Sequence, residues 1–252
     1  MTNAEYAAIA LWCKANGYYP RGNNNYGSDH GYPHEKCRPG TVGSDGRINL
    51  GLTGSGPNSW THDGTPNGIY GLNGDGWEWA IGLRTNNGEI QILTGNNAAK
   101  NTADLTAGSA EWKAILPDGT LVAPGTAGTL KIDIVSGVPK ISTTVKTTTS
   151  SDQWPSTPFK DLAVESGITI PDILKALAVF PSDNSDHAGI DFTQRMTGKN
   201  ASSAVGVGPT RLALAFSVLV ATRVLIPVTT LASAPLTFFC KSVVAATADT
   251  AN

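Results

Sequence analysis

The chain has few of the residues that would build a metal centre, a disulfide framework or a nucleic-acid-binding surface. Its 252 residues include only three cysteines, Cys13, Cys37 and Cys240, which match no metal-binding spacing and fall far short of a disulfide scaffold. We expect Cys13 and Cys37 to be reduced, and a bridge between them is the alternative. The 18 basic residues are outnumbered by 20 acidic ones and form no cluster, so nucleic acid is not an expected partner.

A secretory signal is also missing, because residues 1–16 lack a basic start followed by an unbroken apolar run. Charged residues make up only 15% of the chain, whereas it holds 28 glycines and 15 prolines. So many turn-forming residues exclude a helical bundle and predict a fold in which irregular loops are a large part.

The first helix signal lies at the N-terminus. Thr2 and Glu5 have the spacing of a capping box, and apolar residues then recur at helical intervals. Asn16 and Gly17 predict the end of this helix. Its expected apolar face consists of Tyr6, Ile9, Ala10 and Cys13.

A second helix is predicted within residues 159–180. Thr169 is its expected cap, Pro171 occupies the first turn, and Pro181 ends it. The predicted buried stripe consists of Ile173, Leu174, Leu177 and Ala178.

Short strands are predicted between the two helices. Residues 87–93 alternate after a turn signal, and we expect them to pair with residues 77–83 across Asn86, Asn87 and Gly88. Three further predictions are a hairpin over residues 113–122, turning at Asp118 and Gly119, and strands at residues 129–134 and 139–145.

Two segments predict loops. Residues 18–56 are rich in glycine, asparagine and tyrosine without periodicity, and residues 146–156 are rich in threonine and serine. His30, His34 and His62 match no zinc spacing, so we expect solvated side chains rather than metal ligands.

The densest motif spans residues 59–84, where three tryptophans lie among many glycines. Exposing several indole rings would cost a few kcal/mol, so Trp60, Trp77 and Trp79 are expected to be buried and structural. Glu78, between two of these tryptophans, then needs a hydrogen-bonding partner or a cation.

His62, Asp63 and Glu78 invite an acid-base interpretation. The sequence shows no nucleophile and no second acid-base group at a spacing typical of a catalytic site. A structural role is therefore favoured for these three residues. We interpret His62-Asp63-Gly64 as a turn whose side chains bond backbone amides.

This segment resembles the sulfatase-modifying, formylglycine-generating enzyme family through G-I-Y-G-L-N-G-D-G-W-E-W, from Gly68 to Trp79. W-x-H-D-G-x-x-x-G-I, from Trp60, and G-L-R-x-x-x-G-E-I-Q, from Gly82, look like its phage and prophage branch. The resemblance implies an α+β, irregular, loop-rich C-type lectin-like fold with few short strands and two or three helices.

The resemblance also implies a calcium site. Carried onto this sequence, its positions are Gly71, Gly74, Gly76 and Glu78, and Asp75 is a candidate replacement for the side chain missing at Gly71. Calcium sites in proteins usually contain more than one carboxylate. Whether calcium binds is therefore left undecided by the sequence, and no other cofactor is expected.

The composition changes after residue 198. No acidic residue occurs from Lys199 to Thr247, and the family's closing motifs, R-G-G-x-W and N-x-G-F-R, are absent. If each codon is read from its third base, residues 203–208 can encode R-G-G-G-W and residues 229–234 can encode N-x-G-F-R. We therefore expect residues 1–198 to be an incomplete domain and residues 199–252 to be an apolar tail that is translated out of frame or disordered.

These observations favour a non-catalytic ligand- or host-receptor-binding domain of a phage or prophage structural protein, compromised by loss of the closing motifs. Its expected partner is a host-surface molecule or another virion protein. Assembly into a homo-oligomer is a further alternative. We expect a virion or prophage-encoded protein that is cytoplasmic before assembly.

Two alternatives come from other classes of protein. One is a formylglycine-generating oxidase or another enzyme on the same scaffold, but only Cys240 lies where that chemistry needs a redox cysteine pair. The other is a membrane-tethered module using residues 205–239. Arg223 interrupts the strongly apolar run from Leu212 to Pro227, and the uncharged stretch before it is about half of the roughly 20 residues that a spanning helix needs.

Overall fold

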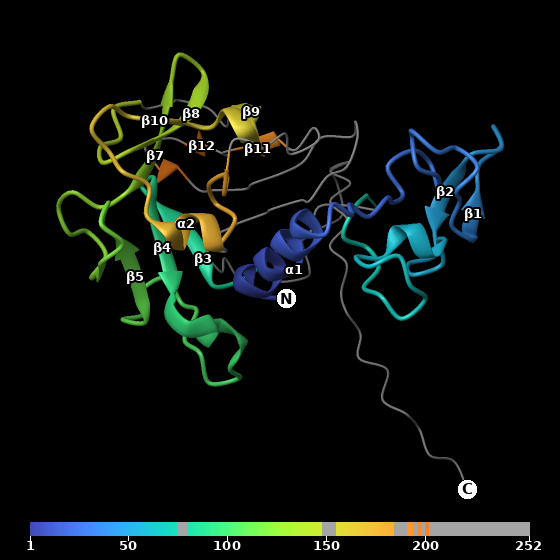
Figure 1. The fold of residues 1–252 in the computed structure, drawn as a ribbon, viewed down its shortest axis with the longest axis horizontal. Coiled ribbons are helices and arrows are strands. Elements are labelled where there is room, and N and C mark those ends of the chain that lie inside the picture. Colours follow the sequence, from blue (N-terminus) through green and yellow to red (C-terminus); the bar gives the residue numbers. More distant parts are fainter. Residues whose placement is uncertain (75–79, 148–154, 184–190, 194–195, 198–199, 202–252) are drawn as a thin grey trace, which may run out of the picture. The chain divides into compact units, whose positions relative to one another are not determined.

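The computed structural model describes residues 1–74, 80–147, 155–183, 191–193, 196–197 and 200–201 (Figure 1). The chain divides into a unit of residues 1–222 and a unit of residues 223–252. The second unit lies wholly outside the described residues, so the description below concerns the first.

Helix α1 spans Asn3–Ala15 and confirms the predicted capping box. The Thr2 hydroxyl accepts the Glu5 backbone N–H at 3.1 Å, and the Glu5 carboxylate accepts the Thr2 backbone N–H at 2.9 Å. Asn16 caps the C-terminal end, and Gly17 has a φ of 61°. These reciprocal bonds satisfy backbone donors that a helix start leaves unpaired.

A seven-stranded sheet follows, in the order β10-β8-β7-β4-β5-β6, with β3 paired to β4 outside this path (Figure 1). All its pairs are antiparallel except β10 with β8. Its strands are β3 (Leu83–Asn86), β4 (Glu89–Leu93), β5 (Trp112–Ile115), β6 (Leu121–Val122), β7 (Lys131–Val135), β8 (Val138–Ser142) and β10 (Ala163–Val164).

The hairpins at β5–β6 and β7–β8 confirm the predicted strands to within a few residues. The prediction that residues 77–83 pair with β4 is wrong, because the partner strand is Leu83–Asn86. Asn87 and Gly88 both have positive φ, at 50° and 77°, which makes a two-residue turn. So short a turn places Asn86 opposite Glu89, and the pairing ends with Leu83 opposite Ile92.

Helix α2 is shorter than predicted and spans Asp172–Ala176. Thr169 is not its cap, because Pro171 takes that position with extended backbone and no side-chain capping bond. Pro181 does not end it either. Ala178 has a φ of 50°, and the Leu174 carbonyl accepts the N–H groups of Val179 and Phe180, which closes the helix early.

The predicted buried stripe of α2 is confirmed at Leu174 and Ala178, which are buried, whereas Ile173 and Leu177 are only partly buried. The Asn3 side chain donates to the Leu177 carbonyl at 3.1 Å. The start of α1 and the end of α2 are thereby joined.

Segment 18–56, predicted as loops, also contains a hairpin of β1 (Pro39–Val42) and β2 (Ile48–Gly51). Every residue of β1 is exposed, so the strand has no buried face that would produce an alternating sequence. The predicted loop at 146–156 lies mostly outside the described residues. The remaining elements are η1 (Asn58–Trp60), η2 (Thr94–Ala99), η3 (Phe159–Asp161), β9 (Ser156–Pro158), β11 (Asp191–Thr193), β12 (Met196–Thr197) and β13 (Asn200–Ala201).

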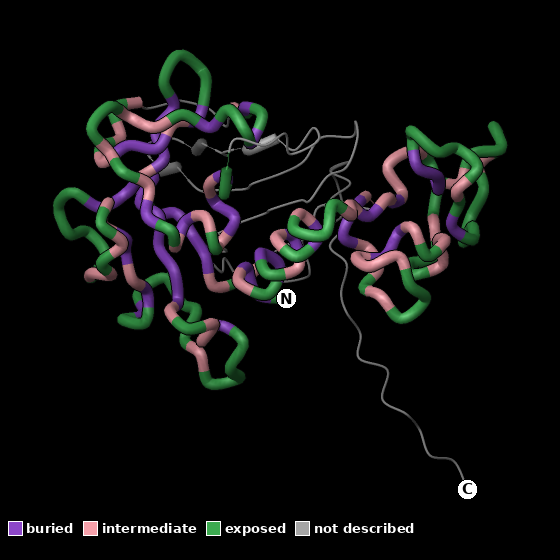
Figure 2. Tube along the Cα trace, viewed as in Figure 1, coloured by how far each residue is buried: buried purple, intermediate pink, exposed green. Residues whose placement is uncertain are grey.

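The main core joins α1 and α2 to one face of the sheet. All five residues of β4 are buried, and Figure 2 shows buried residues following the strands of the sheet. Ile90 and Ile92 belong to the main core, whereas Leu93 packs with Ala98 and Trp112 in a second, smaller cluster. Because side chains alternate along a strand, the odd-numbered residues of β4 project to the other face of the sheet.

The described part of the chain is therefore a mixed α+β fold with few helices and many loops. No helix among the described residues is long and apolar enough to cross a membrane.

Candidate functional site

Trp60, in the sequence motif, is buried and donates its indole N–H to the Glu35 carboxylate at 3.1 Å. Glu35 also accepts hydrogen bonds from Ser59 at 2.8 Å and from the Arg21 guanidinium at 2.8 and 2.5 Å. Burial raises the pKa of Glu35, but the Arg21 and Ser59 bonds outweigh it and hold this pKa below its usual value. Glu35 thus organises the loops around Trp60.

The His62-Asp63 turn has the arrangement that the sequence predicts. Asp63 accepts the Thr65 backbone N–H at 2.9 Å, and His62 Nδ1 accepts the Ile69 backbone N–H at 3.0 Å. The Thr65 bonds, and the nearby His62, hold the pKa of Asp63 below its usual value. A Cβ at Gly68 would lie 2.1 Å from the Asp63 carboxylate, so this turn needs glycine there.

Cys13 and Cys37 are both buried, and no disulfide joins them. Cys13 donates its thiol to the His62 carbonyl at 3.5 Å. Burial raises the pKa of Cys13 to about 11. A nucleophilic cysteine needs a lowered pKa, so the environment of Cys13 does not prime it for catalysis.

The calcium positions implied by the resemblance fall at the edge of the described residues. Gly71 and Gly74 are described, and Gly74 forms a bridge with Asn23, but Asp75, Gly76 and Glu78 lie outside, together with Trp77 and Trp79. Among the described residues, no group of three His, Cys, Asp or Glu side chains is placed to hold a metal ion.

Asn73, which the sequence interpretation did not single out, precedes Gly74 and has a buried side-chain oxygen that could act as a ligand. Its side-chain N–H donates to the Pro20 carbonyl at 3.0 Å, while its Oδ1 is buried and accepts no hydrogen bond from the described residues. Amide oxygens are ligands that calcium accepts.

The G-L-R-x-x-x-G-E-I-Q motif forms a buried polar chain across β3 and β4, here called the Arg84–Glu89 network. Arg84 donates to the Gln91 side-chain carbonyl at 2.7 Å, and the Gln91 amide donates to Glu89 at 2.6 Å. All three side chains are at most 5% exposed. An amide thus bridges a buried cation and a buried anion.

Both ends of this network hold loops in place. Glu89 accepts the Thr129 hydroxyl at 2.5 Å and the Gly125 backbone N–H at 3.1 Å. At the other end, Arg84 lies 4.1 Å above the Trp112 ring and donates to the Ala107 carbonyl at 3.1 Å. Burial lowers the pKa of Arg84, and the Glu89 carboxylate opposes that shift.

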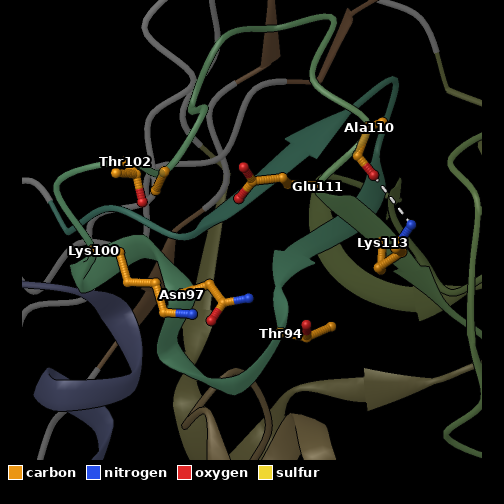
Figure 3. Close-up of a pocket in the computed structure, with 8 residues that line it drawn as sticks. Thr94, Asn97, Lys100, Thr102, Ala110, Glu111 and Lys113 are labelled. Atoms are coloured by element: carbon orange, nitrogen blue, oxygen red, sulfur yellow. Dashed lines mark hydrogen bonds between the residues drawn. The ribbon is translucent and has the colours of Figure 1, made fainter.

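A pocket of about 380 Å³ lies where loop 100–111 meets η2 and β5, and is called here the η2 pocket (Figure 3). Figure 3 shows the Glu111 carboxylate turned toward Thr102 and Lys100, with Lys113 on the opposite side. Besides two alanines, its lining consists of Thr94, Asn97, Lys100, Thr102, Glu111 and Lys113. The lining is therefore dominated by polar and charged groups.

The sequence interpretation missed both the Arg84–Glu89 network and the η2 pocket. A signal for the first existed, since Arg84 lies opposite Gln91 once the two-residue turn at Asn87 and Gly88 is recognised. No comparable signal marks the pocket, because its residues come from a kinked 3-10 segment, a loop and a strand.

No family model matches this chain, and no curated protein matches it. The resemblance described above therefore stays a proposal.

Proposed function

We propose that this chain is a non-catalytic ligand- or host-receptor-binding domain of a phage or prophage structural protein. Its scaffold is a C-type lectin-like fold similar to that of formylglycine-generating enzymes, and its partner is a host-surface molecule or another virion protein. The mixed α+β architecture and abundant loops are compatible with that scaffold.

The observation that carries the proposal is a pair of arginine-stacked tyrosines on segment 18–56. Tyr26 is 60% exposed and lies under Arg47 at 4.6 Å, and Tyr32 is 45% exposed and lies under Arg21 at 4.1 Å. Tyrosine and arginine are enriched in binding interfaces, because they supply a large contact area together with polar groups.

One of these pairs is held rigidly by the motif region. Arg21 is fixed by two hydrogen bonds to Glu35, which is fixed in turn by Ser59 and Trp60. An exposed ring on a fixed arginine loses little conformational entropy on binding a partner. In this proposal, the motif residues serve as a scaffold and the neighbouring loops contact the partner.

The oxidase alternative is weakened by the chemistry of the described residues. Trp60, His62 and Asp63 of the motif are engaged in internal hydrogen bonds, and Cys13 has a raised pKa. Incubation of the chain with a cysteine-containing peptide in air, followed by mass spectrometry, should yield no formylglycine.

The proposal includes the tail, residues 199–252, as an out-of-frame translation of the domain's closing third. The nucleotide sequence of the gene tests this directly. Shifted codons that spell R-G-G-x-W and then N-x-G-F-R would support it, and any other reading would overturn it.

A binding assay tests the function. The labelled full chain is titrated onto purified bacterial envelope fractions, and a Tyr26→Ala/Tyr32→Ala variant is compared with wild type. Loss of interface anchors of this kind weakens binding about tenfold or more. A matched Val135→Ala/Val138→Ala variant, which removes exposed residues of another hairpin and keeps the same tail, should bind like wild type. Equal binding of all three proteins, or no binding at all, would contradict the proposal.

A further inference from the structure

The η2 pocket contains charged groups that form no ion pair among the described residues. Lys14, Lys146, Lys160 and Lys175 each form an ion pair with a carboxylate. Within the described part of the chain, no such pair includes Lys100, Lys113 or Glu111.

The uncharged side chains of the pocket are similarly available. Among the described residues, no side-chain hydrogen bond is formed by Thr94, Asn97 or Thr102. Lys113 donates one bond, to the Ala110 carbonyl at 3.1 Å, and Glu111 accepts one, from the Asp104 backbone N–H at 3.2 Å. The hollow thus presents donors and acceptors together, several of them uncommitted.

The arrangement of charge selects a class of ligand. Two ammonium groups and one carboxylate leave an excess of positive charge in the lining, which favours an anionic ligand. Glu111 would repel a compact inorganic anion, yet it suits a ligand hydroxyl, which donates a hydrogen bond. Threonine hydroxyls and the Asn97 amide both donate and accept, which also matches a ligand with several hydroxyl groups.

The size of the pocket sets a limit on the ligand. A volume of about 380 Å³ lies at the lower end of the range of small-molecule sites. The pocket therefore suits one or two small rings rather than an extended chain.

The pocket wall is also preorganised. Two buried side chains donate hydrogen bonds to loop 100–111. Arg84 donates to the Ala107 carbonyl, and Trp112 donates to the Thr106 carbonyl at 3.0 Å. A wall that is already ordered reduces the entropic cost of binding a ligand. The buried motif thus supports a surface site.

We propose that the η2 pocket binds a carboxylate-bearing saccharide. Lys100 and Lys113 supply positive charge from opposite sides of the pocket, which attracts the anionic ligand, while Glu111 and Asn97 form hydrogen bonds with its ring hydroxyls. The site is separate from the tyrosines of segment 18–56, so it does not depend on the binding surface proposed above.

Ligand-observed NMR on the full chain tests this site, with glucuronate as the probe and glucose and inorganic phosphate as comparisons. We expect saturation transfer to glucuronate, a weaker signal for glucose, and no displacement of glucuronate by an equal concentration of phosphate. Displacement by phosphate would show a non-specific anion site and overturn the proposal, as would the absence of a glucuronate signal.

Variants locate the site. Lys100→Gln/Lys113→Gln should weaken glucuronate binding about tenfold, because charge-assisted hydrogen bonds to the carboxylate are lost. Glu111→Gln should weaken glucose and glucuronate alike. Lys160→Gln removes an exposed lysine elsewhere and serves as the control. Circular dichroism confirms that each variant is folded, and a glucuronate signal unchanged in the double variant would overturn the assignment.

Discussion

The Arg84–Glu89 network and the η2 pocket are neighbouring polar regions with opposite properties. In the network, each charged group is buried and finds partners inside the fold. In the pocket, Lys100 and Glu111 are exposed and form no ion pair among the described residues. A buried charge without partners destabilises the fold, whereas an exposed charge is solvated by water. The charges of the network therefore need partners inside the protein, and those of the pocket do not. Polar groups of the first kind specify the fold, and those of the second kind are available to a ligand.

The largest expected effect follows from breaking the network at Glu89. Glu89→Leu removes the acceptor of the Thr129, Gln91 and Gly125 bonds and leaves the Arg84 cation buried without its anion. Arg84 and Glu89 are bridged by Gln91 rather than paired directly, and leaving a buried charge uncompensated typically costs about 3–5 kcal/mol. We expect a loss of that size in the free energy of unfolding, measured by urea denaturation.

A double variant sharpens this result. Adding Arg84→Met to Glu89→Leu removes the uncompensated cation, so part of the lost stability should return, as observed when both partners of a buried pair become apolar. If the double variant is as unstable as the sum of the single variants, the two charges do not interact through Gln91, and the network is not a single unit.

The thiol of Cys13 gives an intermediate effect, because it is buried with one weak hydrogen bond rather than a network. Burial raises its pKa from 9.0 to about 11, so the folded state keeps the proton over a pH range in which the unfolded state releases it. The resulting stability is fully present below pH 9 and is lost as pH increases toward 11. Denaturation curves at several pH values measure this loss.

Cys13→Ala is the matched control for this measurement. It has no thiol to titrate, so its free energy of unfolding should fall less between pH 9 and 11 than that of wild type. Identical slopes in the two proteins would mean that burial does not shift the Cys13 pKa.

Local signals predicted the fold best where a few adjacent residues decide the structure. The capping box at Thr2 and Glu5 is such a case, because its bonds lie within one helical turn. The β3–β4 register was missed because it depends on whether Asn87 and Gly88 alone form the turn. The early end of α2 depends on the left-handed backbone at Ala178, and alanine gives no signal for that conformation.

The candidate sites were less predictable than the fold. The His62-Asp63 turn follows from short-range chemistry and could be inferred from sequence. The partner of Trp60, however, is Glu35, which lies 25 residues earlier in a segment without periodicity. The η2 pocket needs residues from three elements and has no sequence signature, because exposed polar residues there resemble any solvated surface.

The smallest expected effect completes the comparison. Lys100→Gln and Glu111→Gln change exposed side chains of the η2 pocket, and surface substitutions of this kind usually alter stability by no more than about 0.5 kcal/mol. Their urea denaturation curves should therefore overlay that of wild type. A loss similar to that of Glu89→Leu in either variant would place the pocket charges in the structural framework of the protein. They would then not be free to recognise a ligand, because the fold itself would need them in their present positions.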